Sequence, residues 1–312
     1  MSKFLVSGGA GFIGSHIVEE LAKRGESVRI LDNFSTGRKE NLNNLKGKIE
    51  VIKADIRSKA DCAKACRGVD FVLHQAALRS VPKSMHNPKE YNEVNINGTF
   101  NMLEAAKENK VKRFVFASSS SVYGDVSRFP EKESLSPNPI SPYALTKISA
   151  EYYCRIFSHH YRLPTIALRY FNVFGPRQPL DDEYAVVVPK FINAILNNER
   201  PPIYGNGRQS RDFTFVSNVV NANLLAARNN RLHHGVFNVA SGKDYSVLDL
   251  AGMINGILNK NIKPIFLKKR AGDVFRTLAD LSNAKLKLRY KPQYSLSQGL
   301  KITVDYWVNR GR

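Results

Sequence analysis

The sequence predicts an α/β fold in which a doubly wound parallel sheet is joined to a smaller C-terminal lobe. Up to Asn172, short apolar runs alternate with amphipathic stretches, and beyond it prolines and glycines cluster and the pattern becomes irregular. Strands separated by helices form right-handed βαβ units, which build a doubly wound sheet. We therefore expect one domain over residues 1–172 and a second lobe mainly over 173–312, with segments near 212–239 returning to the first domain.

The expected strands are short and mostly apolar, as buried parallel strands are. They are Phe4–Ser7, Ser27–Asp32, Ile49–Ala54, Val69–Gln75, Arg113–Ser118 and Thr165–Arg169. Amphipathic periodicity predicts helices over Ser15–Arg24 and Val94–Lys107. The segments expected to return to the sheet domain are Phe213–Ala227 and Val236–Val239.

Composition favours an ordinary globular protein. Of 312 residues, 43% are hydrophobic and 24% are charged. No apolar run approaches the roughly 18 residues that a membrane span needs, so we expect no integral membrane association. The N-terminal residues enter a strand and a glycine turn without the layout of a signal peptide. With three cysteines, an odd number, we expect free thiols in a reducing cytoplasm.

The net charge of +20 raises the question of nucleic-acid binding. The charges are spread along the chain, however, and no recognition helix, zinc finger or ribonucleoprotein signature accompanies them. A solvated basic surface is the simpler interpretation, and no nucleic-acid partner is expected. The adjacent pairs His159-His160 and His233-His234 lack a partnering cluster, so no metal site is predicted.

A glycine string follows the first expected strand and opens the first helix. Gly8, Gly11 and Gly14 let the backbone turn tightly and approach a pyrophosphate at the helix N-terminus, as in a Rossmann-type dinucleotide site. Asp32 ends the second strand, where a carboxylate can bind the ribose diol and would repel a 2′-phosphate. NAD is therefore favoured over NADP. Asp55, after the third strand, could meet the adenine amino group.

Tyr143 and Lys147 lie four residues apart, which places them on one face of a helix. A phenol with a pKa of about 10 is only about one part in a thousand ionised at neutral pH. A nearby lysine and a positive nicotinamide ring are expected to favour the phenolate and lower that pKa. The run Ser118–Ser121 closes the fifth strand, where a hydroxyl can bind the substrate oxygen and relay a proton.

Several further motifs occur in order along nearly the whole chain. They are GGAGFIG at 8–14, DNFSTG at 32–37, HQAA at 74–77, Asn95, SSSSVYG at 118–124, SPYALTK at 141–147, LRYFN at 168–172, RDF at 211–213 and RAGD at 270–273. In these motifs the chain resembles the extended short-chain dehydrogenase/reductases. Among them it resembles the UDP-hexose 4-epimerases, especially those acting on UDP-N-acetylglucosamine.

The resemblance implies roles for individual residues. Its catalytic set would be Ser119, Tyr143 and Lys147. Contacts with NAD are implied for Gly8, Gly11, Phe12, Ile13, Gly14, Asp32, Asn33, Ser35, Gly37, Asp55, Ile56, Ala76, Asn95, Tyr143, Lys147 and Tyr170. Contacts with the sugar nucleotide are implied for Arg79, Ser80, Ser119, Ser120, Asn172, Val188, Tyr204, Arg211, Arg270, Asp273 and Thr277.

The residues after Ser119 bear on the reaction. Related dehydratases carry an Asp-Glu pair at this place and related decarboxylases a glutamate, whereas this chain has Ser120 and Ser121. The resemblance therefore implies a 4-epimerase that acts through a transient 4-keto sugar and a tightly held NAD. Two other interpretations stay open: an NAD(P)-dependent sugar-nucleotide reductase, which Asp32 disfavours, and a binding protein without catalysis.

The sugar is less firmly indicated. In the family, a small side chain at the position of Thr277 admits an N-acetyl group, so UDP-N-acetylglucosamine and UDP-glucose are the expected substrates. The charge of Arg79 could instead receive a C6 carboxylate, which would indicate a UDP-hexuronate. Relatives are usually homodimers, and the resemblance implies an interface of the helices around Asn95–Lys107 and Tyr143–His160.

Overall fold

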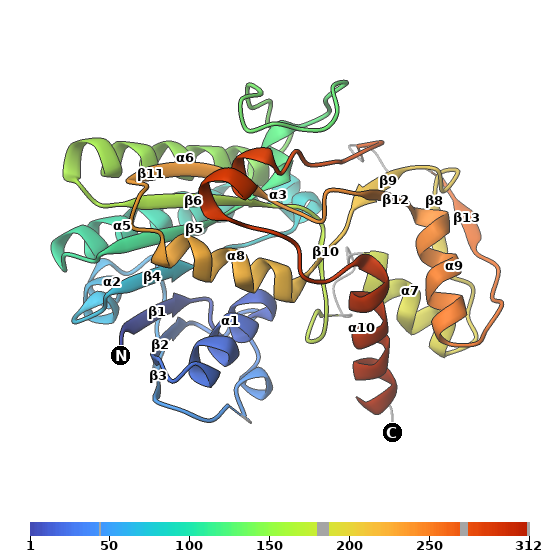
Figure 1. Ribbon diagram of the computed structural model, residues 1–312, viewed down its shortest axis with the longest axis horizontal. Coiled ribbons are helices and arrows are strands. Elements are labelled where there is room, and N and C mark those ends of the chain that lie inside the picture. The colour runs from blue at the N-terminus through green and yellow to red at the C-terminus, as the bar shows by residue number, and fades with distance from the viewer. Residues whose placement is uncertain (44, 180–186, 269–273, 311–312) are drawn as a thin grey trace.

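A computed structural model describes residues 1–43, 45–179, 187–268 and 274–310. Its larger part is a parallel sheet with helices on both faces, and a smaller lobe stands beside one end of the sheet (Figure 1). The expected α/β fold with a doubly wound, Rossmann-type sheet is confirmed.

Seven parallel strands form the main sheet in the order β11-β6-β5-β4-β1-β2-β3. Their bounds are β1 (Lys3–Ser7), β2 (Ser27–Asp32), β3 (Ile49–Lys53), β4 (Phe71–His74), β5 (Arg113–Ser119), β6 (Thr165–Tyr170) and β11 (His234–Val239). The strand order reverses between β1 and β4. In doubly wound sheets this switch point opens a crevice at the carboxyl ends of the strands, where ligands bind.

Helices pack on the two faces of the sheet, α1 and α8 on one and α2, α5 and α6 on the other (Figure 1). Their bounds are α1 (Phe12–Lys23), α8 (Val216–Arg228), α2 (Lys59–Cys66), α5 (Gly98–Glu108) and α6 (Pro142–Tyr161). Successive strand side chains point to opposite faces. Phe4 and Val6 of β1 therefore join the core under α1 and α8, whereas Leu5 joins the core under α2 and α5.

The smaller lobe has its own apolar core, built around Phe174, Phe191, Leu250 and Leu300. Its elements are β7 (Val173–Phe174), α7 (Val187–Leu196), β8 (Pro202–Tyr204), β9 (Ser210–Asp212), β10 (Thr214–Phe215), β12 (Asp244–Ser246), α9 (Val247–Ile257), β13 (Ile265–Leu267) and α10 (Leu296–Arg310). Short helical segments complete the chain: η1 (Lys39–Asn41), α3 (Val81–His86), α4 (Pro88–Tyr91), η2 (Asn92–Asn97), η3 (Ser120–Tyr123) and η4 (Ala284–Leu288).

The expected strands agree with the observed ones to within about two residues at each end. Two helices differ more. The first begins at Phe12 instead of Ser15, because the glycine turn itself forms the helix entry. The helix expected to begin at Val94 starts earlier, as the wider π-helical turn of η2, before it continues as α5. Amphipathic periodicity carries no signal for such a change of winding.

Cys62, Cys66 and Cys154 are buried, and their thiols are free. No helix in the described ranges is both long and apolar enough to cross a membrane.

Candidate active site

The glycine turn at the switch point leaves no room for side chains. Gly8 has a φ of +69°, and a Cβ atom added there would lie 2.8 Å from the backbone nitrogen of Ala76, two residues after β4. A Cβ on Gly14 would lie 2.1 Å from the carbonyl oxygen of Gly8. The first amides of α1, at Phe12 and Ile13, have no acceptor within the helix. This turn fits the pyrophosphate of a dinucleotide.

Asp32 ends β2 beside this turn and is buried. Its carboxylate accepts the amide of Ala10 at 2.9 Å and the amide of Phe34 at 2.8 Å. Burial raises the pKa of Asp32, while these two bonds oppose the rise. Gly37 closes over the carboxylate, since a Cβ there would lie 2.7 Å from Asp32 Oδ1. Each oxygen keeps a lone pair, as binding of a ribose diol requires.

The loops after β2 and β3 are joined by Asn33, whose amide donates to Asp55 at 2.8 Å. Asn33 also accepts the amide of Ser35 at 3.0 Å. Arg57 forms two side-chain bonds to Asp55, at 3.0 and 2.8 Å, and holds the pKa of that carboxyl well below its usual range. Ile56, between these two residues, is buried. The residues expected at the adenine end therefore form one connected loop structure.

Asn95 and Tyr170 are buried with their polar atoms engaged in the protein. The Asn95 amide accepts from the Leu78 amide at 2.8 Å and donates to the Leu78 carbonyl at 2.9 Å, and it also donates to Thr146 at 3.1 Å. It thus ties the loop after β4 to α6. The Tyr170 hydroxyl bonds with Asn223, and burial raises its pKa. Both side chains therefore stabilise the elements around the expected cofactor site through hydrogen bonds within the protein.

Helix α6 presents the expected catalytic residues at the carboxyl end of β5. Its N-cap, Ser141, accepts the Ala144 amide at 3.2 Å. In the first turn of the helix, Tyr143 shares a hydrogen bond with Ser119, the last residue of β5. Ser121 donates to the Ser119 hydroxyl at 2.9 Å. The structure therefore brings the phenol and the serine together, as a proton relay requires.

Lys147 is buried one turn further along α6. Its Nζ donates to the Ala117 carbonyl at 2.8 Å and lies 5.8 Å from the centre of the Tyr143 ring. The aromatic face of Phe116 covers it at 5.0 Å. Burial lowers the pKa of Lys147 to about 7, and the charge of Glu151 opposes that fall.

In the protein alone, the pKa of Tyr143 is not lowered, whereas the expected lowering relied on Lys147 together with a positive nicotinamide ring. Burial raises the pKa of Tyr143, although the bond with Ser119 and the charge of Arg79 act in the opposite direction. The reason is that Lys147 turns its ammonium toward the Ala117 carbonyl and is itself poorly solvated. In the protein alone, desolvation of the phenolate outweighs its stabilisation.

His74, at the end of β4, is held neutral under the site. Its ring nitrogens lie 2.6 Å from Ser7 Oγ and 3.0 Å from Thr99 Oγ1, and burial lowers its pKa to about 3. The sequence motif contained His74, but its role as a neutral link between β1, β4 and α5 was not predicted.

Asn172 and Thr277 meet where the small lobe faces the sheet. Asn172, with a φ of +32°, donates to the Asp212 carbonyl at 3.1 Å and to the Thr277 hydroxyl at 3.0 Å. The buried Asp212 carboxylate accepts the amides of Ser241 at 2.8 Å and Gly242 at 3.0 Å. These bonds hold the end of β9 against the loop that follows β11. Sequence analysis gave no role to Asp212, whose importance lies in contacts distant along the chain.

The other residues expected at the sugar nucleotide lie on several elements. Arg211 donates to the carbonyls of Ser210 and Phe275, at 2.9 and 3.1 Å. Tyr204 ends β8, and the Val188 side chain is buried in the lobe core. Arg270 and Asp273 lie outside the described residues.

Nearer to Tyr143, Arg79 is exposed, whereas Ser80 and Ser120 are half-buried. Ser80 caps α3 and donates its amide to the Tyr91 hydroxyl at 3.0 Å. No metal-binding cluster of acidic, histidine or cysteine side chains occurs in the part of the chain that the structure describes.

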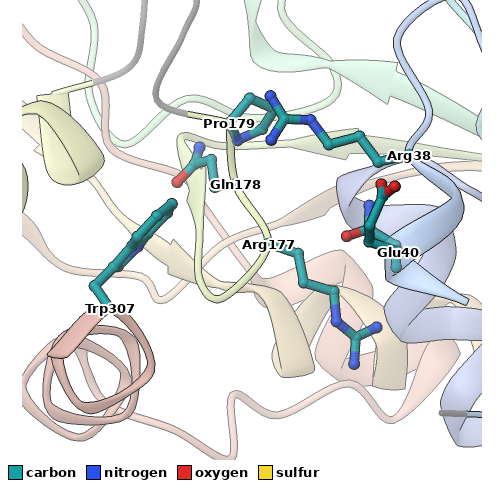
Figure 2. A pocket seen from close by; sticks show the side chains of 7 residues that line it. Arg38, Glu40, Arg177, Gln178, Pro179 and Trp307 are labelled. Carbon is teal, nitrogen blue, oxygen red and sulfur yellow. The ribbon is translucent and has the colours of Figure 1, made fainter. Parts of the chain in front are cut away.

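A cavity of about 140 Å³ lies beside the loop that follows β2, between Arg38 and Trp307 of α10 (Figure 2). Gln178 points between Pro179 and Trp307, and the Arg177 guanidinium turns away toward α1. Among the described residues, Gln178 Oε1 and Trp307 Nε1 have no partner, so we expect bound water there.

Comparison with known proteins places these features in a family. Residues 4–240 match the model of the NAD dependent epimerase/dehydratase family. A UDP-N-acetylglucosamine 4-epimerase from Methanobrevibacter ruminantium, solved with UDP-N-acetylmuramic acid, is 44% identical, with a TM-score of 0.95 and 99% of both chains covered. A Bacillus cereus UDP-glucuronic acid 4-epimerase, solved with UDP-glucuronic acid and NAD, is 34% identical, with a TM-score of 0.91 and 99% of both chains covered. A UDP-glucose 4-epimerase from Mycolicibacterium smegmatis is 36% identical and 99% of both chains is covered.

Replacing Gly14 by alanine should remove most of the bound NAD. The added methyl group would meet the Gly8 carbonyl at 2.1 Å and push apart the turn that faces the pyrophosphate. We expect the NAD content after purification, measured by chromatography of the denatured protein, to fall by at least about tenfold, equivalent to about 1.4 kcal/mol. Gly252→Ala on α9 is the matched control, because a Cβ there meets nothing within 4 Å. Equal NAD content in both variants would contradict the assignment of the turn.

Proposed function

Since this chain belongs to the NAD dependent epimerase/dehydratase family, we propose that it is a UDP-sugar 4-epimerase acting on UDP-N-acetylglucosamine and UDP-glucose. Membership confirms the family expected from the sequence and NAD as the cofactor. The observation that carries the proposal is the constellation of Ser119, Tyr143 and Lys147 at the carboxyl end of β5.

Tyr143 is the base that removes the proton of the 4-hydroxyl group. Ser119 shares a hydrogen bond with it and can hold the same substrate oxygen, which gives the proton a path. The glycine turn and Asp32 would hold NAD, which would supply the reversible oxidising power needed at C4. Its positive ring would also add the stabilisation of the phenolate that the protein alone lacks.

Inversion requires the 4-keto sugar to turn before it is reduced again. Rotation about the diphosphate link would present the opposite face of the carbonyl, after which Tyr143 returns the proton. No acidic side chain follows Ser119, since Ser120 and Ser121 occupy those positions. A group that could drive elimination of water is therefore missing at this place, which favours epimerisation over dehydration.

Thr277 supports a pocket that admits an N-acetyl group. Its side chain is small, 9% exposed, and fixed by the bond from Asn172. The uronate alternative rests on Arg79, whose charge acts on Tyr143 and could also receive a C6 carboxylate. A sugar-nucleotide reductase is the less favoured alternative, because Asp32 would repel the 2′-phosphate of NADP.

We further propose a homodimer formed through α5 and α6. Leu145, Tyr152 and Ile156 of α6 are 53%, 53% and 44% exposed and follow a helical spacing, so they form an apolar stripe that a second copy could cover.

The three free, buried thiols support a cytoplasmic location.

Replacing Tyr143 by phenylalanine should abolish epimerisation and leave NAD bound. Only the phenolic oxygen is lost, so we expect turnover of UDP-N-acetylglucosamine to fall by at least about a thousandfold, within the range for loss of a general base. Product chromatography measures the turnover. Tyr161→Phe, at the exposed end of the same helix, should keep full activity. Substantial epimerisation by the Tyr143→Phe protein would exclude the proposed base.

Replacing Thr277 by tyrosine should suppress the N-acetylated substrate selectively. The purified protein, without added NAD, is incubated separately with UDP-N-acetylglucosamine, UDP-glucose and the two corresponding uronates. We expect the ratio of kcat/KM for the N-acetylated over the plain sugar to fall by at least about tenfold, the effect of about 1.4 kcal/mol of steric conflict. Thr277→Ser retains the hydroxyl bonded to Asn172 and should keep the ratio. An unchanged ratio in the tyrosine variant would refute the pocket, and a wild-type preference for uronates would favour the alternative.

A further inference from the structure

A buried ion pair lies behind the Tyr143–Lys147 pair. The Glu151 carboxylate accepts Arg169 Nε at 2.9 Å and Nη2 at 2.7 Å, and both side chains are 4% exposed. Ser118 donates its hydroxyl to the same carboxylate. The Arg169 guanidinium also stacks on the Tyr123 ring, at 4.7 Å from its centre. A buried pair of this kind adds little stability over apolar packing, so its presence calls for a specific role.

The pair joins the catalytic helix to the strand that carries Ser119. Ser118 and Arg169 are register partners across β5 and β6. Glu151 follows Lys147 by four residues and lies on the same face of α6. Because Lys147 donates to the Ala117 carbonyl and Glu151 accepts from Ser118, two successive turns of the helix are bonded to consecutive residues of β5. The next residue of that strand is Ser119.

The charges around Lys147 make Glu151 its electrostatic partner. Tyr143 and Glu151 face it from α6, and β5 contributes only the Phe116 ring and a carbonyl. His74 approaches from β4, but it is neutral because burial lowers its pKa to about 3. Arg169, from β6, is bonded to Glu151 and not to Lys147. The negative charge that acts on Lys147 therefore comes from Glu151.

We propose that Glu151 is a positioning residue: it fixes α6 against β5 through Ser118 and Arg169, and it presents a negative charge to Lys147. The catalytic meaning of this role rests on the proposed function. The spacing of Tyr143, Lys147 and Glu151, each four residues apart, was available in the sequence. Arg169 and Ser118 could not be assigned as its partners without the register of β5 and β6.

The test is Glu151→Gln, which keeps the shape of the side chain and an acceptor for Ser118 but removes the charge. Lysine-labelled protein is titrated by NMR, and the Lys147 resonance is assigned with Lys147→Arg. We expect the midpoint for Lys147 to fall by about one pH unit, as loss of a nearby opposite charge predicts. The alkaline decline of kcat should move to lower pH in the same way, with activity recovering on the acidic side.

Glu104→Gln is the matched control, since it removes the same charge from the surface pair of Glu104 with Lys59 on the neighbouring helices. It should leave the Lys147 midpoint unchanged. If Glu151→Gln alone does not fold, because Arg169 is left buried without an opposite charge, Glu151→Gln with Arg169→Gln removes both charges and should shift the midpoint in the same direction but by less, since loss of the Arg169 charge acts the opposite way. An unmoved midpoint in a folded variant overturns the role of Glu151. Absence of turnover in the wild type would count against the proposed function, while the NMR midpoint would still decide this inference.

Discussion

The docking of α6 onto the end of β5 is the interaction on which the rest of the site depends. It brings together a phenol, an ammonium group and a serine, of which Lys147 is buried and Tyr143 and Ser119 are half-buried. Loss of solvation carries a cost, because it raises the pKa of Tyr143 and lowers that of Lys147, so each charged form is disfavoured. The surrounding structure compensates with a carbonyl at Ala117 and a carboxylate at Glu151.

The opposing effects on the Tyr143 pKa indicate a second role for the cofactor beside hydride transfer, which is to stabilise the phenolate. The protein alone does not favour the phenolate of Tyr143, whereas an oxidised nicotinamide brings a positive charge that does. The base would then be strongest when the oxidant is in place and weaker after the hydride has been taken, which suits a proton that must be returned. The glycine turn is packed tightly enough that one methyl group at Gly14 would lie 2.1 Å from the Gly8 carbonyl oxygen, so only glycine fits the turn that would face the pyrophosphate.

Much of the sheet domain could be predicted from the sequence, because buried parallel strands are continuous apolar runs and the glycine turn has a fixed spacing. The pairing of Tyr143 with Lys147 also follows from helix periodicity. The direction of the Tyr143 pKa in the protein alone did not, because desolvation of the phenol depends on packing by residues distant in sequence, such as Tyr91. The same holds for the Glu151–Arg169 pair and for Asp212, whose partners are set by strand register. Arg270 and Asp273, expected from motif resemblance alone, lie outside the described residues, so their place at the sugar nucleotide remains a prediction.

The most direct measurement follows deuterium placed on C4 of UDP-N-acetylglucosamine through many turnovers, with mass spectrometry of both epimers and of the coenzyme. If one enclosed oxidant takes and returns the same hydride, the label will stay on C4 in substrate and product, and no reduced coenzyme will build up in solution. Loss of the label to water, or its appearance in free reduced coenzyme, would contradict that mechanism.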